Sequence, residues 1–259
     1  MQLCRFLYKN ETFFGSICNG VINPIDGDPF SKYTINSLEI SLSEVKLLVP
    51  VVPPTFYAIG SNYRNHIVGL AKKNNTKPIF YDKPRIGYRA NSALIADKEK
   101  IIKPIDATDD FQYEGELVAV IGKKGKNLTP EQALDYIYGW TIGNDISERN
   151  WQKTDPTNLR SKNSDTFKPM GPWITTDIKF DEMRTIVRLN GKKIHDFPTS
   201  NMLFSPGEII AEISKYNALS PGDVIWLGTD EIPLNLKNGD SIEIEISGIG
   251  TLENRVVSA

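Results

Sequence analysis

The feature that most constrains this chain is an apolar strand pattern with two acidic residues at its entrance. Residues 117–121 are all apolar, and Glu114 and Glu116 precede them with Gly115 in between. Side chains two residues apart in a strand point to the same face, so both carboxylates would meet at one spot. Two like charges beside an apolar run cost free energy unless a cation neutralises them. The stretch therefore predicts a strand whose entrance faces positive charge.

A third carboxylate follows a second apolar stretch. Asp145 follows residues 138–143, which are also rich in strand-forming side chains, with Asn144 in between. Three converging carboxylates suggest a hard divalent cation held by oxygen ligands, such as Mg²⁺, Mn²⁺ or Ca²⁺. On spacing alone, the simpler interpretation is a solvated strand face, with Asp145 as a turn residue.

Composition limits the class of protein. The chain has 259 residues, 40% hydrophobic and 24% charged, which suffices for one large domain or a large domain with a small appendage. The formal net charge of -2 shows no basic excess, so we expect no nucleic-acid partner.

The sequence also indicates the compartment. No stretch approaches the length of a membrane span, and the N-terminal residues lack the apolar core of a signal peptide. Cys4 and Cys18 are too few for a disulfide framework. With only His66 and His195 besides, the chain is poorly supplied for a His/Cys zinc site. We expect a soluble cytoplasmic protein without a membrane partner.

Several local signals predict secondary structure. Asn190-Gly191 between two strand patterns predicts a hairpin with a type I′ turn. Thr129 and Ser205 each begin a capping box with proline at the first helical position. Residues 147–152 read as one short helix, followed by a polar loop.

The order of these elements predicts the architecture. Strand patterns outnumber helix patterns and no regular βαβ alternation occurs, which favours an α+β, mostly β fold over a doubly wound sheet. Consecutive prolines at positions 53 and 54 interrupt regular pairing. They divide a small N-terminal antiparallel β domain, residues 1–52, from a larger domain, residues 53–259.

Three positively charged or titratable side chains stand out. His66 follows a strand pattern ending at Gly60 and sits on a short helix from about Arg64, which Asn62 could cap. It could be a catalytic residue on a lid or a surface histidine. Lys83 ends a short strand, where it could bind an acidic substrate. The polar segment 153–165 contains Lys162 and is a long loop of the kind that is often functional.

Taken together, these motifs resemble the fumarylacetoacetate hydrolase family, in family order and over about residues 54–257. The residues that carry the resemblance are Gly60-Ser61-Asn62-Tyr63 with His66, Pro78-Ile79-Phe80 with Lys83, Tyr113-Glu114-Gly115-Glu116-Leu117 with Val120-Ile121-Gly122, Asn144-Asp145-Ile146-Ser147-Glu148-Arg149 with Gln152, Lys162 with Asp165-Thr166-Phe167, Pro169-Met170-Gly171-Pro172-Trp173, Pro221-Gly222-Asp223-Val224-Ile225, and Gly228-Thr229.

The resemblance implies a β-roll-like catalytic domain, a homodimer, and a divalent metal, Mg²⁺ or Mn²⁺. It is nearest to the 2-hydroxyhepta-2,4-diene-1,7-dioate isomerase-like and acylpyruvase-like branch. It also implies roles for particular residues: metal ligands at Glu114, Glu116 and Asp145, a catalytic cation at Lys162, a base at His66, and substrate contacts at Arg149, Gln152, Thr229 and Lys83.

Two departures from the family pattern bear on the reaction. The family's hydrolases place a glutamate three residues after the histidine, where this chain has Gly69. The carboxylate that would orient His66 is therefore missing, which puts water activation in doubt. The second departure follows Thr229, where residues 230–233 replace the family's proline and glycine-rich loop.

Three functions remain open. The first is a metal-dependent isomerase, tautomerase or decarboxylase of an unsaturated 2-oxo dicarboxylate, working through an enolate. The second is a carbon–carbon hydrolase of a β-diketo acid in which another group orients His66. The third is a catalytically silent metal- and ligand-binding protein. The intact set of carboxylates with Lys162 favours catalysis.

Overall fold

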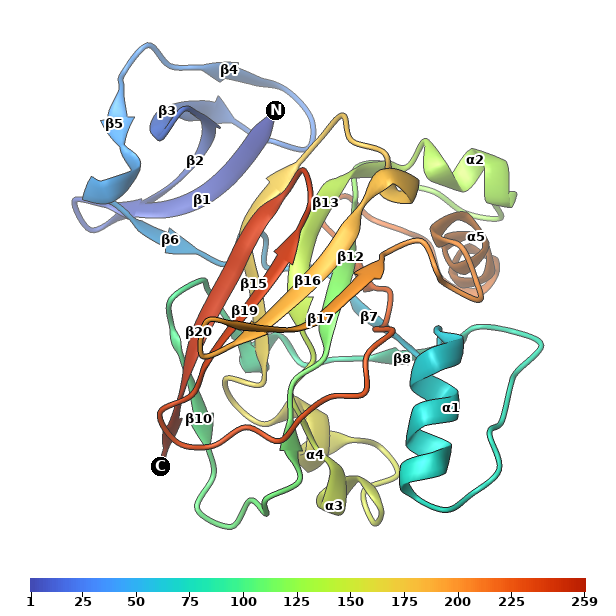
Figure 1. The fold of residues 1–259 in the computed structure, drawn as a ribbon. Coiled ribbons are helices and arrows are strands. Elements are labelled where there is room, and N and C mark those ends of the chain that lie inside the picture. The colour runs from blue at the N-terminus through green and yellow to red at the C-terminus, as the bar shows by residue number, and fades with distance from the viewer.

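The computed structural model describes residues 1–259 and consists mainly of β-strands, with five short α-helices outside the sheets (Figure 1). This is the α+β, mostly β fold that the strand patterns predict. None of its helices combines the length and the apolar character needed to cross a membrane.

The first fifty residues form six strands whose pairings with one another are all antiparallel. Their bounds are β1 (Gln2–Tyr8), β2 (Glu11–Cys18), β3 (Val21–Gly27), β4 (Tyr33–Ile35), β5 (Ile40–Ser41) and β6 (Lys46–Leu48). Gln2 and Leu3 of β1 also pair with Thr175 and Ile174 of β15 (Lys168–Thr175). These strands therefore extend the same sheet as the rest of the chain, at the upper left of Figure 1.

The long sheet continues through the strands that carry the acidic motif. Its order is β4-β3-β2-β1-β15-β13-β12-β18-β7-β8, with β9 beside β15. The further bounds are β7 (Phe56–Gly60), β8 (Arg85–Tyr88), β9 (Leu94–Ile95), β12 (Gly115–Ile121), β13 (Ile137–Asn144) and β18 (Val224–Trp226). Every residue of β12 is buried, because both faces of this central strand are covered.

A second sheet covers one face of the first (Figure 1). Its order is β10 (Lys100–Lys103), β20 (Gly250–Ser258), β19 (Ser241–Ile246), β16 (Arg184–Leu189) and β17 (Lys192–Pro198). Ile242, Ile244 and Ile246 alternate inward from β19 and join the main core. A β-carbon on Gly115 would lie 3.1 Å from Ile244, so glycine between the two glutamates lets the sheets approach closely.

The helices begin where the capping signals predict. Thr129 and Ser205 each accept a hydrogen bond in a complete capping box. In the predicted hairpin, Asn190 and Gly191 both have positive φ, as a type I′ turn requires. The helices are α1 (Arg64–Lys73), α2 (Pro130–Leu134), α3 (Arg149–Gln152), α4 (Leu159–Asn163) and α5 (Pro206–Tyr216), with 3-10 turns at Leu42–Glu44, Asn91–Ala93 and Phe180–Glu182.

Four local predictions were wrong. Lys83 does not end a strand, because residues 76–84 form no strand and β8 begins at Arg85. Residues 147–152 are not one helix, since β14 (Ser147–Glu148) pairs with β11 (Phe111–Gln112) before α3 begins. The expected loop at 153–165 contains α4. The Asn62 side chain does not cap α1 but donates hydrogen bonds to the carbonyls of Leu227 and Phe204. For residues 147–152 and for Asn62, a partner distant in sequence overrides the local signal. For α4 the partner is local, since Asp155 accepts hydrogen bonds from the N–H groups of residues 159–161.

Candidate metal centre

Three buried carboxylates converge where β12 begins and β13 ends. The pairing of Gly115 with Asn144 sets the two strands side by side, and the N–H of Asp145 donates to the Glu114 carbonyl at 2.8 Å. One oxygen from each of Glu114, Glu116 and Asp145 lies within 4.8 Å of the others. The alternative of a solvated strand face is therefore wrong, because none of these residues is more than 5% exposed.

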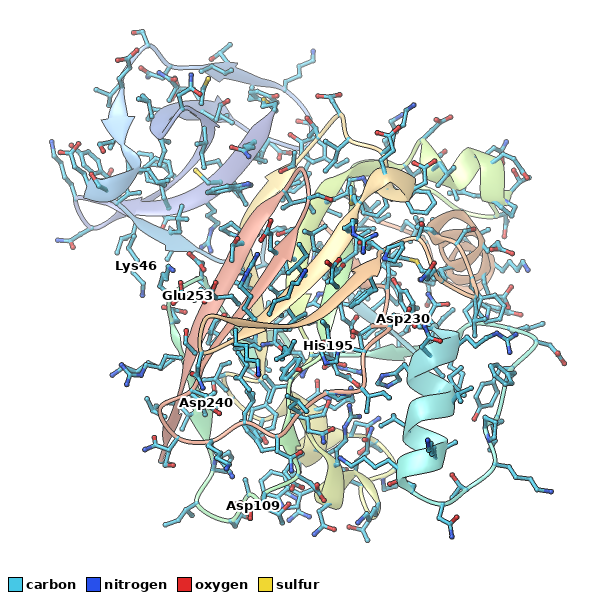
Figure 2. The ribbon with its side chains drawn as sticks, viewed as in Figure 1. Lys46, Asp109, His195, Asp230, Asp240 and Glu253 are labelled. Atoms are coloured by element: carbon cyan, nitrogen blue, oxygen red, sulfur yellow. The ribbon has the colours of Figure 1, made fainter.

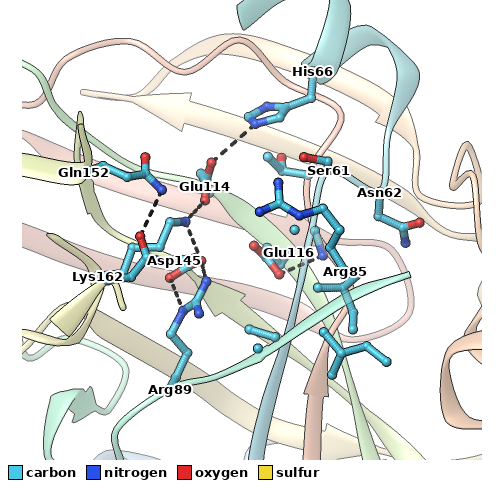
Figure 3. A pocket seen from close by; sticks show the side chains of 18 of the residues that line it. Ser61, Asn62, His66, Arg85, Arg89, Glu114, Glu116, Asp145, Gln152 and Lys162 are labelled. Atoms are coloured by element: carbon cyan, nitrogen blue, oxygen red, sulfur yellow. Dashed lines mark hydrogen bonds and ion pairs between the residues drawn. The ribbon is translucent and has the colours of Figure 1, made fainter. Parts of the chain in front are cut away.

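Cationic side chains neutralise two of the three carboxylates (Figure 3). The Lys162 ammonium lies 2.6 Å from Glu114 and 2.7 Å from Asp145. Arg149 also pairs with Glu114. Burial alone would raise the pKa of Glu114, but these two cations lower it to about 2.

Asp145 has two further cationic partners. Arg89 donates to its carboxylate through Nε at 3.2 Å and Nη2 at 2.8 Å, and Lys168 lies 2.6 Å from Oδ1. Against the effect of burial, Arg89 and the two lysines hold the pKa of Asp145 well below its usual range. Lys168 is fully buried, and burial lowers the pKa of its ammonium to about 7.

Glu116 differs from its two neighbours because no cationic side chain contacts it. It accepts one hydrogen bond, from the N–H of Gly228 at 2.8 Å. Burial, then Asp145 and Glu114, raise the pKa of Glu116 well above its usual range. A buried carboxylate without a cation, beside two oxygens of the same kind, fits a hard divalent cation such as Mg²⁺ or Mn²⁺.

His66 is buried on α1 and directed at this cluster (Figure 3). Its Nε2 lies 3.5 Å from Oε1 of Glu114, and its Nδ1 lies 2.6 Å from the carbonyl oxygen of Glu231. Burial lowers the pKa of the imidazole, although Glu114 opposes the shift. His66 is therefore not a surface histidine.

The cluster opens into a cavity of about 510 Å³. Predicted site residues that line it are Glu114, Glu116, Asp145, His66, Lys162, Arg149, Gln152 and Thr229. Arg149 bridges Glu114, Gln112 and Gln152, so the cation predicted to contact substrate also supports a carboxylate. The Thr229 hydroxyl is buried without a hydrogen-bond partner.

Lys83 is the one predicted site residue that does not reach the cavity. Its side chain is 72% exposed, and its ammonium lies 3.9 Å from Glu212 on α5. Motif reading missed Arg85 and Arg89 on and beside β8, as well as Lys168 and Glu231. Two arginines within residues 85–89 are a sequence signal for an anion-binding segment. Glu231 lies in a stretch that the sequence marks only as a departure from the family pattern.

Comparison with known proteins gives the family. The model described as fumarylacetoacetate (FAA) hydrolase C-terminal matches residues 55–257, and the model described as Rv2993c-like, N-terminal, matches residues 1–50. The chain belongs to the fumarylacetoacetate hydrolase family. It is 38% identical over 269 residues to protein Rv2993c of Mycobacterium tuberculosis, covering 99% of this chain and 98% of that protein.

Two solved structures of the family are similar over the whole chain. One is 5-carboxymethyl-2-hydroxymuconate delta-isomerase from Mycobacterium smegmatis, with 34% identity, full coverage of both chains and a TM-score of 0.91. The other is 2-hydroxyhepta-2,4-diene-1,7-dioate isomerase from Mycobacterium marinum, with 34% identity, coverage of 100% and 98%, and a TM-score of 0.89. The chain thus has the enzyme fold of this family, with neighbours named as isomerases.

Proposed function

We propose that this protein is a divalent-metal-dependent enzyme that isomerises or decarboxylates an unsaturated 2-oxo dicarboxylate, or its enol, through an enolate. The observation that carries the proposal is the buried oxygen cluster of Glu114, Glu116 and Asp145 at a cavity lined by cations. The two isomerase structures that resemble the chain support it, since one is named for a dioate substrate.

The three carboxylates would hold Mg²⁺ or Mn²⁺, and Ca²⁺ is a plausible substitute for the same oxygen ligands. When bound, the ion supplies a Lewis acid for the negative charge that develops on an enolate. Lys162 adds positive charge at the same place. His66 directs Nε2 toward the cluster and is the group placed to move a proton to or from the substrate carbon.

Arg85 is the side chain that we expect to bind a second carboxylate of the substrate. This guanidinium lines the cavity, across it from Lys162 in Figure 3, and pairs with no carboxylate of the protein. Its Cζ lies 4.8 Å from the centroid of the Tyr81 ring. Arg89, Arg149 and Lys162 are already paired with the metal-binding carboxylates. Arg85 therefore supports a dianionic substrate and is a further candidate for substrate binding, with Gln152 and Thr229.

One observation favours a carbon–carbon hydrolase as the second candidate. Although position 69 is glycine, His66 does not lack an orienting group, because the Glu231 carbonyl accepts from its Nδ1 at 2.6 Å. An oriented imidazole could activate water for cleavage of a β-diketo acid.

A metal-supplemented screen tests these candidates. Purified protein is incubated with Mg²⁺ or Mn²⁺ and with 2-oxo acids, β-diketo acids and their enols, while enol absorbance and CO₂ release are followed. We expect metal-dependent enol loss or CO₂ release with a dicarboxylate. Two acid products from a β-diketo acid would instead establish the hydrolase. Full activity in excess chelator, or no turnover of any compound, would exclude the proposal, and the second result would favour a silent binding protein.

A further inference from the structure

The loop after Thr229 takes up the space beside the histidine helix. A β-carbon on Gly69 would lie 2.3 Å from Cδ1 and 2.4 Å from Cγ1 of Ile232, so the Ile232 side chain would have to move to admit it. The backbone of Gly69 has ordinary helical geometry, so no unusual backbone conformation requires glycine there. What glycine provides at this position is room for the Ile232 side chain. The two departures from the family pattern, at position 69 and at residues 230–233, are therefore one structural feature.

The same loop also holds the first turn of α1 by two contacts on the N-terminal side of Gly69. Asn65 donates to Asp230 Oδ2 at 3.0 Å, and His66 Nδ1 contacts the Glu231 carbonyl at 2.6 Å. A carbonyl only accepts, so this contact places a proton on Nδ1. In the neutral imidazole, Nε2 then carries the lone pair that can accept a proton, 3.5 Å from Oε1 of Glu114. Figure 2 shows Asp230 next to the first turn of α1.

Glu231 also reaches the strand that carries the metal-binding carboxylates. Its Oε1 accepts from the N–H of Gly115 at 2.7 Å, the residue between Glu114 and Glu116. The residue is 2% exposed. Its other oxygen lies 3.7 Å from Nε2 of His195, which Figure 2 labels on β17. One residue thus contacts the metal strand through its side chain and His66 through its main chain.

We propose that Glu231 is a positioning residue: its carboxyl group fixes the loop to Gly115 so that its carbonyl holds His66 in the orientation that presents Nε2 to the cluster. The loop performs here the task that a carboxylate at position 69 performs in the family's hydrolases. This inference rests on the proposed function for its catalytic consequence, but the orientation of His66 is measurable without any substrate.

Two pairs of variants test it. Glu231→Gln keeps an oxygen for Gly115, whereas Glu231→Ala removes it. Gly69→Ala pushes against Ile232, whereas Gly69→Ala with Ile232→Ala relieves the clash. Alanine normally stabilises a helix relative to glycine, so harm from Gly69→Ala would come from the loop and not from α1. The second pair decides the matter if Glu231→Ala does not fold.

The first readout is the tautomer of His66, measured by long-range ¹H–¹⁵N correlation in the protein labelled at histidine. The chain has only two histidines, and His66→Asn assigns the signal. We expect the Nδ1–H form in the wild type, in Glu231→Gln and in the double variant, and a mixture of tautomers in Glu231→Ala and Gly69→Ala. The Nδ1–H form retained in both of the latter would overturn the inference.

The second readout is kinetic. We expect kcat to fall about tenfold or more in Glu231→Ala and Gly69→Ala, with KM nearly unchanged, because a displaced base affects the chemical step. Glu231→Gln and the double variant should recover at least half of kcat. Equal kcat in all four variants would overturn the inference. If the wild type turns over no 2-oxo acid, the proposed function fails, and the tautomer alone decides the role of Glu231.

Discussion

The three carboxylates of the cluster have unequal surroundings, and this gives each a different sensitivity to substitution. Glu114 and Asp145 are paired with cations, so removing either would leave buried positive charges without partners. Glu116 has only the N–H of Gly228. In the absence of metal it is the least favourably placed charge of the three.

We therefore expect Glu116→Gln to abolish activity while leaving the fold intact. The amide keeps the shape of the side chain but removes an anionic metal ligand, so kcat/KM should fall at least a hundredfold, about 3 kcal/mol of transition-state stabilisation. Steady-state kinetics with saturating Mg²⁺ measures the loss. Lys100→Gln is the control, because Lys100 is exposed on β10 and its substitution should leave the activity unchanged. Gln152→Glu is unsuitable as a control because it adds a charge to the cavity. Activity within threefold of the wild type in Glu116→Gln would exclude Glu116 as a ligand.

A second residue-scale prediction concerns the pH dependence of stability. Burial raises the pKa of Glu231 from 4.5 to about 8. Between these values the folded state holds a proton on Glu231 that the unfolded state has lost. The contribution of this group to the free energy of unfolding is therefore fully present below about pH 4.5 and is lost as the pH rises toward 8. Glu231→Gln removes this group.

The amide variant should therefore gain stability over the wild type as the pH rises, by on the order of 2 to 4 kcal/mol between pH 5 and pH 8. Urea unfolding of both metal-free proteins at the two pH values measures the difference. Parallel losses of stability in the two proteins would show that Glu231 is not the group responsible.

At the scale of elements, six segments of the chain meet at the site. β12 and β13 bring the carboxylates, α1 brings His66, α4 brings Lys162, and β8 brings Arg85 with Arg89 directly after it. The loop after β18 closes the remaining side. A substitution in any of these elements can change one function of the site and leave the others.

Arg85→Ala provides such a case. We expect KM for a 2-oxo dicarboxylate to rise about tenfold or more, because the second carboxylate of the substrate loses its guanidinium partner, while KM for a monocarboxylate analogue stays within twofold. Arg64→Ala is the matched control: Arg64 stacks on Phe80 as Arg85 stacks on Tyr81, but it does not line the cavity. An equal rise for both substrates would mean that Arg85 does not read the second carboxylate.

Elements with local signals could be predicted from the sequence, and those set by distant partners could not. Both capping boxes and the Asn190-Gly191 hairpin depend on neighbours within a few residues, and all three are confirmed. The alternation in Glu114-Gly115-Glu116 likewise placed two carboxylates together.

The cations and the orienting group depend on tertiary structure. Arg89 precedes Asp145 by 56 residues, and Glu231 lies 116 residues from Gly115. No periodicity connects residues that far apart, so the cation pairs of Asp145 and the partner of His66 emerge only from the fold. The sequence shows that Gly69 departs from the family pattern. Only the structure shows that the Ile232 side chain occupies the space next to it.

For the whole molecule, the family resemblance predicts a homodimer. The protomer is 29.1 kDa, so light scattering should give twice that mass. Ile79, Phe80 and Tyr81 are exposed by 61%, 41% and 40%, a run of apolar surface that we propose lies at this interface. We expect Phe80→Asp to weaken the dimer. Light scattering of the wild-type protein is repeated over tenfold steps of concentration up to the solubility limit. A monomeric mass at every concentration would contradict the prediction.

Metal binding should also stabilise the whole molecule, because the cluster joins the central strands of the long sheet. An ion that binds only the folded state stabilises it by about 2.7 kcal/mol at a hundred times its Kd. For a domain of this size that corresponds to a rise of roughly 5–10 °C in Tm. We expect Mg²⁺ and Mn²⁺ to raise Tm and chelator to reverse the rise. Glu116→Gln should melt at least as high as the wild type in chelator, since it removes the free-energy cost of burying or protonating the Glu116 carboxylate, and should gain little from metal. A wild-type Tm that does not respond to either ion, measured by calorimetry, would contradict a metal site at Glu114, Glu116 and Asp145.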